Sequence, residues 1–229
     1  MDAILDFLNT QAFTLGGTPV YRVELIGFAL GVFNVYLLTR LNILNFPIGI
    51  AMVSMYFIVF LNAKLYADMW LQVFFIVVQF FGWWAWLKAG PNRTELKVRN
   101  TNWWIVGATV TGVIVATLFL RPILHDAHGA YPTWDALSTS LSIGAQILLS
   151  FKILENWYMW IVADIIYIPV YFLKDLYFTS FLYVIFMGLC VLGLIEWTKA
   201  KRRNDQTRPA EFVLDVDSLK PQVPVTDKP

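Results

Sequence analysis

The chain has 229 residues, of which 58% are hydrophobic and only 14% are charged. Soluble domains carry about 25% charged residues, and so short a chain cannot readily build a core that hides this much apolar surface, so the composition indicates a membrane protein. The formal net charge of +1 says little about partners, because the charges are segregated by position, and we expect no nucleic-acid partner. A single cysteine, Cys190, excludes an internal disulfide framework. The two histidines, His125 and His128, lie in one predicted loop, which excludes a haem held between two helices.

Residues 1–20 form an outer segment ahead of the first predicted span. Asp2 and Asp6 stand where a signal peptide carries positive charge, so we expect no cleaved signal peptide. The apolar positions of this segment predict a short helix that lies along the outer face of the membrane. They are Ile4, Leu5, Leu8 and Phe13.

Seven apolar windows follow, each long enough to cross about 30 Å of hydrocarbon. They cover residues 22–39, 44–62, 69–87, 103–120, 134–151, 157–173 and 179–197. The connections hold four Lys and Arg residues on the N-terminal side and ten on the other side, before the tail is counted. We therefore expect the N-terminus outside and the C-terminus in the cytoplasm, with residues 200–229 as a disordered cytoplasmic tail.

The chain contains an internal repeat at an offset of 111 residues. Residues 45–88 align with 156–199 without a gap, and twelve of the 44 columns are identical. Glu24 and Asp135 fall on the same offset, which extends the repeat to the first span of each half. The identical pairs include Asn45 with Asn156, Tyr56 with Tyr167, Gly82 with Gly193 and Trp86 with Trp197.

The repeat predicts the fold class and the domains. We expect an all-α membrane protein of seven transmembrane helices, arranged as two parallel three-helix repeats that one linker helix joins (3+1+3). The first repeat covers 21–88, the loop and linker helix 89–125, and the second repeat 126–199. Because parallel repeats of this kind hold a binding site between the halves near the midplane, the fold indicates a transporter.

Polar and aromatic side chains differ between the two halves at equivalent positions. The second half has Trp157, Trp160 and Asp164 where the first has Phe46, Gly49 and Val53. The first half has Gln72, Gln79 and Trp83 where the second has Tyr183, Cys190 and Leu194. At about 100° per residue, one stripe of the sixth span carries Asn156, Trp160, Asp164, Tyr167 and Tyr171. The fifth span adds Ser138, Ser142 and Gln146 along one face. An asymmetric substrate requires this kind of asymmetric site.

Asp164 is the acidic residue at depth in the sixth span, and insertion of such a carboxylate costs about 2.5–3.5 kcal/mol. A water-filled cavity, tyrosine donors, a transferable proton or a cationic ligand could each offset that cost. Trp157 and Trp160 lie within two helical turns of it, and aromatic faces attract cations. The combination favours a pocket for a flat, positively charged ring over pure packing.

Other candidates have structural readings that stay open. Asn45 and Asn156 either cap their helices or bind substrate, and Gln79 and Gln146 either bind substrate or join helices. The tryptophans near span ends are predicted to be interfacial belt anchors. They are Trp86, Trp103, Trp104 and Trp197.

The segment "ENWYMWIVADIIYIPVYFLKDLYFTSFLY" (155–183) resembles the signature segment of the PnuC family of nicotinamide riboside transporters. "NFPIGIAMVSMYFIVFLNAKLYADMWLQ" (45–72) and "QFFGWWAW" (79–86) resemble the matching first-half segments. The resemblance implies a SWEET-like fold, a homotrimer in the bacterial inner membrane, and facilitated diffusion of nicotinamide riboside. It also implies a cytoplasmic riboside kinase that traps the substrate, and no cofactor.

The family's binding motif maps onto Asn156, Trp157 and Trp160, with Gln79, Trp83 and Gln146 as partners from facing helices. We add Asp164 and Tyr167 from the same stripe of the sixth span. Phe46 departs from the tryptophan expected at that position in the first half. Related family members carry thiamine or riboflavin, so another vitamin is an alternative substrate. A proton-coupled carrier that uses Asp164 is a further alternative, whereas no residue constellation supports an enzyme or an ATP-driven pump.

Overall fold

A computed structural model describes residues 6–8, 10–15, 17–62, 66–89, 95–126, 131–173 and 177–206. Within these ranges, the side chains at 18, 24, 58–62, 66–68, 71 and 179 are left undescribed. Several predictions fall outside the described residues. These are the start of the outer segment (1–5), the Glu24 side chain, His128, and the part of the tail beyond residue 206.

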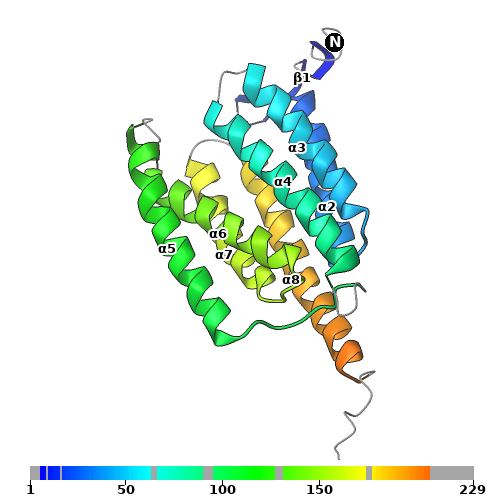
Figure 1. Cartoon of the computed structure of the whole chain (residues 1–229). Helices are drawn as coiled ribbons and strands as arrows, with labels where there is room; N and C mark the ends of the chain where they lie inside the picture. Colours follow the sequence, from blue (N-terminus) through cyan, green and yellow to red (C-terminus); the bar gives the residue numbers. More distant parts are fainter. Residues whose placement is uncertain are drawn as a thin grey trace, which may run out of the picture.

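The described residues form a short helical turn at residues 6–8, a small hairpin and then seven helices (Figure 1). The hairpin pairs β1 (Gln11–Leu15) with β2 (Thr18–Tyr21) in antiparallel register. The helices are α2 (Arg22–Thr39), α3 (Asn45–Asn62), α4 (Tyr66–Lys88), α5 (Trp103–Asp126), α6 (Pro132–Ser150), α7 (Asn156–Leu173) and α8 (Tyr177–Gln206). Each predicted span falls on one of these helices.

Three boundaries correct the sequence predictions. Phe13 lies in β1 rather than in an interfacial helix. α5 runs to Asp126 and includes His125, which the sequence placed in a loop. α8 runs to Gln206, so residues 200–206 of the predicted disordered tail are helical. The hairpin and the end of α8 lie at opposite ends of the bundle (Figure 1).

The helices pack in a pattern that repeats between the halves. Within each half the first helix packs on the second and the second on the third: α2 on α3 and α3 on α4, then α6 on α7 and α7 on α8. Between the halves, α2 packs on α8 and α6 packs on α4. Each of these contacts joins the first helix of one half to the third helix of the other. α5 packs along α6 at one side of the bundle (Figure 1).

The first helix of each half ends in the same backbone geometry. After α2, Leu41 takes φ 55°, and after α6, Lys152 takes φ 50°. These two residues are equivalent under the 111-residue offset. Asn42 N donates to Leu37 O at 3.0 Å, and Ile153 N donates to Leu148 O at 3.0 Å. This six-to-one bond with a left-handed residue is a Schellman motif, which satisfies terminal carbonyls.

The outer faces of the helices are apolar. Among the described residues, three helical segments are long and apolar enough to cross a membrane: Trp103–Asp126, Asn156–Leu173 and Ser180–Gln206. Shorter apolar helical segments cover Leu25–Thr39 and Asn45–Phe57. On α5, Leu118 is 65% exposed and Phe119 is 68% exposed. Side chains of this size in such numbers require lipid rather than water around them.

Candidate functional site

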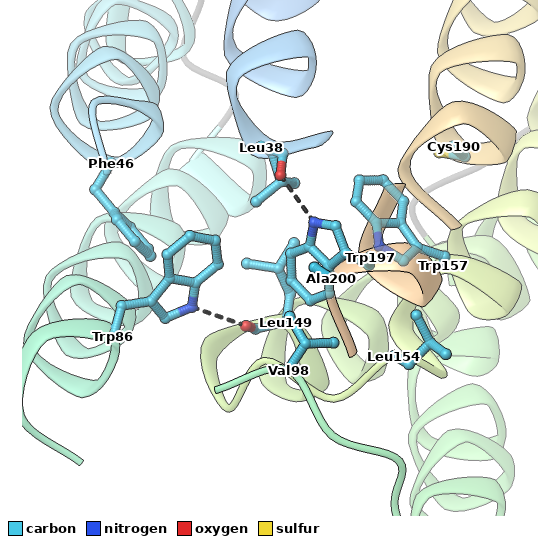
Figure 2. Close-up of a cluster of buried hydrophobic side chains, with 10 residues drawn as sticks. All are labelled: Leu38, Phe46, Trp86, Val98, Leu149, Leu154, Trp157, Cys190, Trp197 and Ala200. Atoms are coloured by element: carbon cyan, nitrogen blue, oxygen red, sulfur yellow. Dashed lines mark hydrogen bonds between the residues drawn. The ribbon is translucent and has the colours of Figure 1, made fainter. Parts of the chain in front are cut away.

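Two equivalent tryptophans join the halves at the end of the bundle where α8 terminates. Trp86 Nε1 donates to Leu149 O at 3.1 Å, and Trp197 Nε1 donates to Leu38 O at 3.0 Å (Figure 2). Both the donors and the acceptors are related by 111 residues. The two indole rings also meet edge to face at 5.7 Å. We call Trp86 and Trp197 the tryptophan pair.

This arrangement corrects the prediction that Trp86 and Trp197 are belt anchors, because they are 1% and 0% exposed. Each lies in the contact between the first helix of one half and the third helix of the other. The other two predicted anchors, Trp103 and Trp104, are both 67% exposed. A buried indole N–H needs an acceptor, and the carbonyls of Leu38 and Leu149, which each already accept one backbone N–H, provide their second lone pair.

The start of the second helix in each half packs a ring against the tryptophan pair. Phe46 meets Trp86 edge to face at 5.0 Å, and its equivalent Trp157 meets Trp197 at 5.4 Å (Figure 2). Each ring also covers a glycine, Gly82 under Phe46 and Gly193 under Trp157. The larger indole lies so close to Gly193 that a Cβ there would overlap it.

The two repeated asparagines occupy equivalent turns. Asn45 Nδ2 donates to Asn42 O and Asn156 Nδ2 donates to Ile153 O, both at 2.7 Å. Both asparagines therefore stabilise the turn before their helix, as the structural alternative predicted. Only in the second half is the side-chain oxygen also buried without a hydrogen-bond partner among the described residues.

Buried polar atoms without hydrogen-bond partners gather at the start of α7. Five such side-chain atoms occur among the described residues: Asn34 Oδ1, Thr101 Oγ1, Asn156 Oδ1, Trp157 Nε1 and Trp160 Nε1. Three of the five belong to the first two turns of α7. Buried polar groups are normally hydrogen-bonded. Because these atoms have no partner among the described residues, a polar ligand or water can supply one.

Asp164 lies one turn beyond Trp160 on α7 and is 2% exposed. Its Oδ2 accepts a weak bond from Cys190 Sγ at 3.5 Å. None of the described Lys and Arg side chains pairs with it. The contact joins α7 to α8, so Asp164 holds two helices of the second half together as well as offering a buried acid.

Tyr167 lies three residues further along α7. Its hydroxyl is 3.3 Å from Ser142 Oγ on α6. Because the Ser142 hydroxyl already donates to Ser138 O at 2.9 Å, Tyr167 donates in this bond. The ring of Tyr167 packs against Tyr183 at 4.7 Å and Tyr171 at 5.7 Å. Residues Tyr171 and Tyr183 complete an aromatic cluster that the predicted site did not include.

The predicted partners on the facing helices are buried in the interior. Gln79 is 8% exposed and lies over Gly49, where an added Cβ would overlap its amide nitrogen. The same added Cβ would lie 3.4 Å from Asn34 Nδ2, so the two amides meet at this glycine. Asn34 was outside the predicted site, and its signal was its helical spacing from Gly27 and Gly31, which places the three on one polar or small face of the first span. Trp83 and Trp160 both pack against the buried cluster drawn in Figure 2, and Gln146 is buried on α6.

The predicted site residues on α7 do not form one contact surface. Asn156 and Tyr167 are eleven residues apart, which is about 16 Å along a helix. The structure groups Asn156, Trp157 and Trp160 near the tryptophan pair, and Tyr167 with the tyrosine cluster. A nucleoside-sized ligand contacts only part of this length at once.

Apolar outer faces around a buried polar interior define a multi-pass membrane protein, and known proteins agree. The family model described as nicotinamide mononucleotide transporter matches residues 21–199, which includes both repeats. The "Nicotinamide riboside transporter PnuC" of Escherichia coli is 28% identical over 87% of this chain and 97% of its own length. The "Riboflavin/roseoflavin transporter RibM" of Streptomyces davaonensis is 23% identical over 88% of this chain and 96% of its own.

A solved structure described as the vitamin B3 transporter PnuC matches with a TM-score of 0.63 at 27% identity. The match covers 79% of this chain and 82% of that chain. The chain therefore belongs to the nicotinamide mononucleotide transporter family, which includes the PnuC proteins. Its family and relatives are transporters, not enzymes.

Proposed function

We propose that the chain transports nicotinamide riboside across the bacterial inner membrane by facilitated diffusion. The carrying observation is the group of three buried, unpartnered polar atoms on Asn156, Trp157 and Trp160. The first half lacks the two indoles, because Phe46 and Gly49 stand at the equivalent positions. Relatives named as PnuC nicotinamide riboside transporters support the choice of substrate.

The proposed architecture is the 3+1+3 arrangement of seven transmembrane helices. Helices α2–α4 form the first repeat, α6–α8 the second, and α5 is the linker. The equivalent contacts of α2 with α8 and of α6 with α4 support this arrangement. We place the end of the bundle that carries the C-terminus of α8 in the cytoplasm, because Lys and Arg are in excess in the connections on that side.

In the proposed complex the nicotinamide ring stacks on Trp160, and Asn156 and Gln79 bond the carboxamide or the ribose hydroxyls. The ring of Trp157 is 0% exposed and covers Gly193, so we assign it the Nε1–H contact and the support of Trp160. Trp83 and Gln146 line the facing side of the site. Asp164 supplies compensating negative charge to the pyridinium, and Tyr167 lies at the far end of the pathway.

Alternating access requires that the two halves rock about the site. The tryptophan pair holds them together at the α8 end by two equivalent hydrogen bonds. We propose that these bonds break when substrate leaves towards the cytoplasm, where a riboside kinase traps it. We also propose a homotrimer, in line with the family resemblance of the sequence.

A second candidate substrate is another vitamin of similar shape. The relative named as a riboflavin/roseoflavin transporter favours riboflavin in particular. Thiamine shares the flat cationic ring that the buried acid and the indoles favour.

Uptake into proteoliposomes that contain the purified chain and no kinase tests the proposal. Labelled nicotinamide riboside should equilibrate to the outside concentration and stop there, and unlabelled riboside should compete better than riboflavin or thiamine. Accumulation above the outside concentration would rule out facilitated diffusion. Stronger competition by riboflavin or thiamine would show that this vitamin is the substrate, and the proposed location of the site would remain.

A further inference from the structure

A pocket of about 440 Å³ opens at the α8 end of the bundle, outside the proposed substrate site. It lies between the end of α4, the segment after it, the turn that follows α6, and the last turns of α8. Three cationic side chains and one carboxylate line it: Lys97, Lys152, Arg203 and Glu95. Trp86 of the tryptophan pair forms part of its wall.

Lys152 is the unusual member of this lining. It is only 8% exposed, and none of the described carboxylates lies within ion-pair distance of its Nζ. The Nζ instead lies 4.3 Å from the centroid of the Trp86 ring. Burial lowers the pKa of Lys152, and the charge of Glu95 opposes that shift. Lysine is rarely this buried unless it is paired, and the Trp86 ring is a cation–π partner that carries no negative charge, so the pocket can accept an anion beside this cation.

Ordered backbone bonds hold the wall of the pocket. Leu96 N donates to Trp86 O at 3.1 Å, which ties the segment after α4 to the end of that helix. Arg99 N donates to Lys152 O at 3.1 Å, and Leu154 N donates to Arg99 O at 2.9 Å. These bonds fix the left-handed backbone of Lys152 against the segment after α4. Leu41, its equivalent in the first half, lines the same pocket without a charge.

We propose that this pocket binds a phosphate group, with Lys152 as the central ligand and Lys97 and Arg203 at the rim. The lining carries three positive charges against one negative, which favours an anionic phosphate group. The negative charge of Glu95 repels anions, so we expect only an anion that contacts the cationic side chains to bind. Asn204, which also lines the pocket, offers an uncharged hydrogen-bond group.

The phosphate can come from two sources at this end of the protein. One is a soluble phosphorylated compound, and the other is the headgroup of an anionic lipid. Only the placement of the pocket in the cytoplasm rests on the proposed function. Phosphate binding in the pocket does not depend on riboside transport, so the failure of one would leave the other standing.

The test uses the purified full chain in an uncharged detergent. Titration with inorganic pyrophosphate and with adenosine monophosphate is followed by calorimetry and by thermal unfolding. A second arm compares the unfolding temperature in nanodiscs of phosphatidylglycerol and of phosphatidylcholine. The diagnostic variant is Lys152→Leu, because Leu41 shows that leucine fits the same backbone geometry. Lys88→Met is the matched control, an exposed lysine at the same end that does not line the pocket.

We expect the soluble phosphates to bind the wild type and Lys88→Met alike, and to bind Lys152→Leu about tenfold more weakly or not at all. Stabilisation by phosphatidylglycerol alone, lost in Lys152→Leu, would assign the site to a lipid headgroup. No effect in either arm, or equal effects in Lys152→Leu, would overturn the proposal. If Lys152→Leu does not fold, Lys97→Met at the exposed rim gives the same comparison.

Discussion

The two halves of this molecule share a scaffold and differ in chemistry. The first helix of each half ends with the same left-handed turn. Each repeated asparagine bonds the carbonyl three residues before it, and each half contributes one tryptophan of the pair. Along the second helix the halves diverge, and three of the differing positions carry candidate site residues. The second half has Trp157, Trp160 and Asp164 at the positions equivalent to Phe46, Gly49 and Val53 of the first half.

This difference separates what folds the protein from what serves its substrate. The tryptophans shared by both halves are satisfied, because each indole of the tryptophan pair has an acceptor. Unpartnered atoms appear where only the second half has the polar group, as at the Nε1 atoms of Trp157 and Trp160. A symmetric scaffold can thus carry a site for a ligand that has no two-fold symmetry.

The largest expected effect comes from breaking the tryptophan pair. Trp86→Ala and Trp197→Ala should each destabilise the protein by about 3–5 kcal/mol, because each removes a buried indole and its bond to the opposite half. The two losses should be similar, since the environments are equivalent. Chemical unfolding in detergent measures both. If one variant is as stable as the wild type, the pair does not join the halves symmetrically.

A smaller effect distinguishes the ring that each half packs on its glycine. Gly193→Ala should cost about 1–3 kcal/mol, and more than Gly82→Ala, because the Trp157 indole overlaps the added methyl group more than the Phe46 ring does. Trp157→Phe should restore part of the stability of Gly193→Ala, since it supplies the first half's own residue. A double-mutant cycle measured by thermal unfolding tests this. Additive losses would contradict the packing described here.

The asparagines separate stability from binding. Asn45→Ala and Asn156→Ala should each cost about 1 kcal/mol, because each loses a bond to the carbonyl three residues earlier. Asn156→Ala should also weaken nicotinamide riboside binding about tenfold, since its oxygen is buried and has no hydrogen-bond partner among the described residues. Asn45→Ala serves as the matched control in the same calorimetric titration. Equal affinities in the two variants would remove Asn156 from the site.

The smallest expected effect concerns Asp164 as a proton carrier. Under facilitated diffusion, an imposed pH gradient should not change riboside uptake into proteoliposomes. Asp164→Asn should transport more slowly, because the amide keeps the shape of the side chain beside Cys190 but supplies no negative charge to the pyridinium, and its uptake should be equally independent of the gradient. Uptake that follows the gradient in the wild type and loses that dependence in Asp164→Asn would instead support the proton-coupled carrier.

Much of the fold could be predicted from the sequence, because long apolar runs between charged connections determine where helices form. The predicted spans 22–39 and 157–173 match α2 and α7 to within a residue. The hairpin was missed, although paired glycines at 16 and 17 between short apolar runs are a turn signal. The ends of α5 and α8 were placed too early, because a helix continues past the apolar window that the span rule measures.

The site was harder to predict, because burial depends on which helix faces a residue. Trp86 and Trp197 lie near span ends, so depth alone suggested the lipid interface, whereas the packing of α4 on α6 and of α8 on α2 buries them. Their identity across the repeat was the available signal for a shared structural role. Lys152 was counted as a charge in a connection, and its burial against Trp86 follows from a turn geometry that the sequence does not reveal.

The measurement that tests the central claim most directly is calorimetric binding of nicotinamide riboside to the purified chain, with Trp160→Ala and Phe46→Ala titrated alongside. These residues lie at asymmetric positions of opposite halves, and the substrate is proposed to stack only on Trp160. We expect the wild type and Phe46→Ala to bind the riboside, and Trp160→Ala to bind it at least about tenfold more weakly. Unchanged affinity in Trp160→Ala, or an equal loss in folded Phe46→Ala, would contradict a site built on the asymmetric residues of the second half.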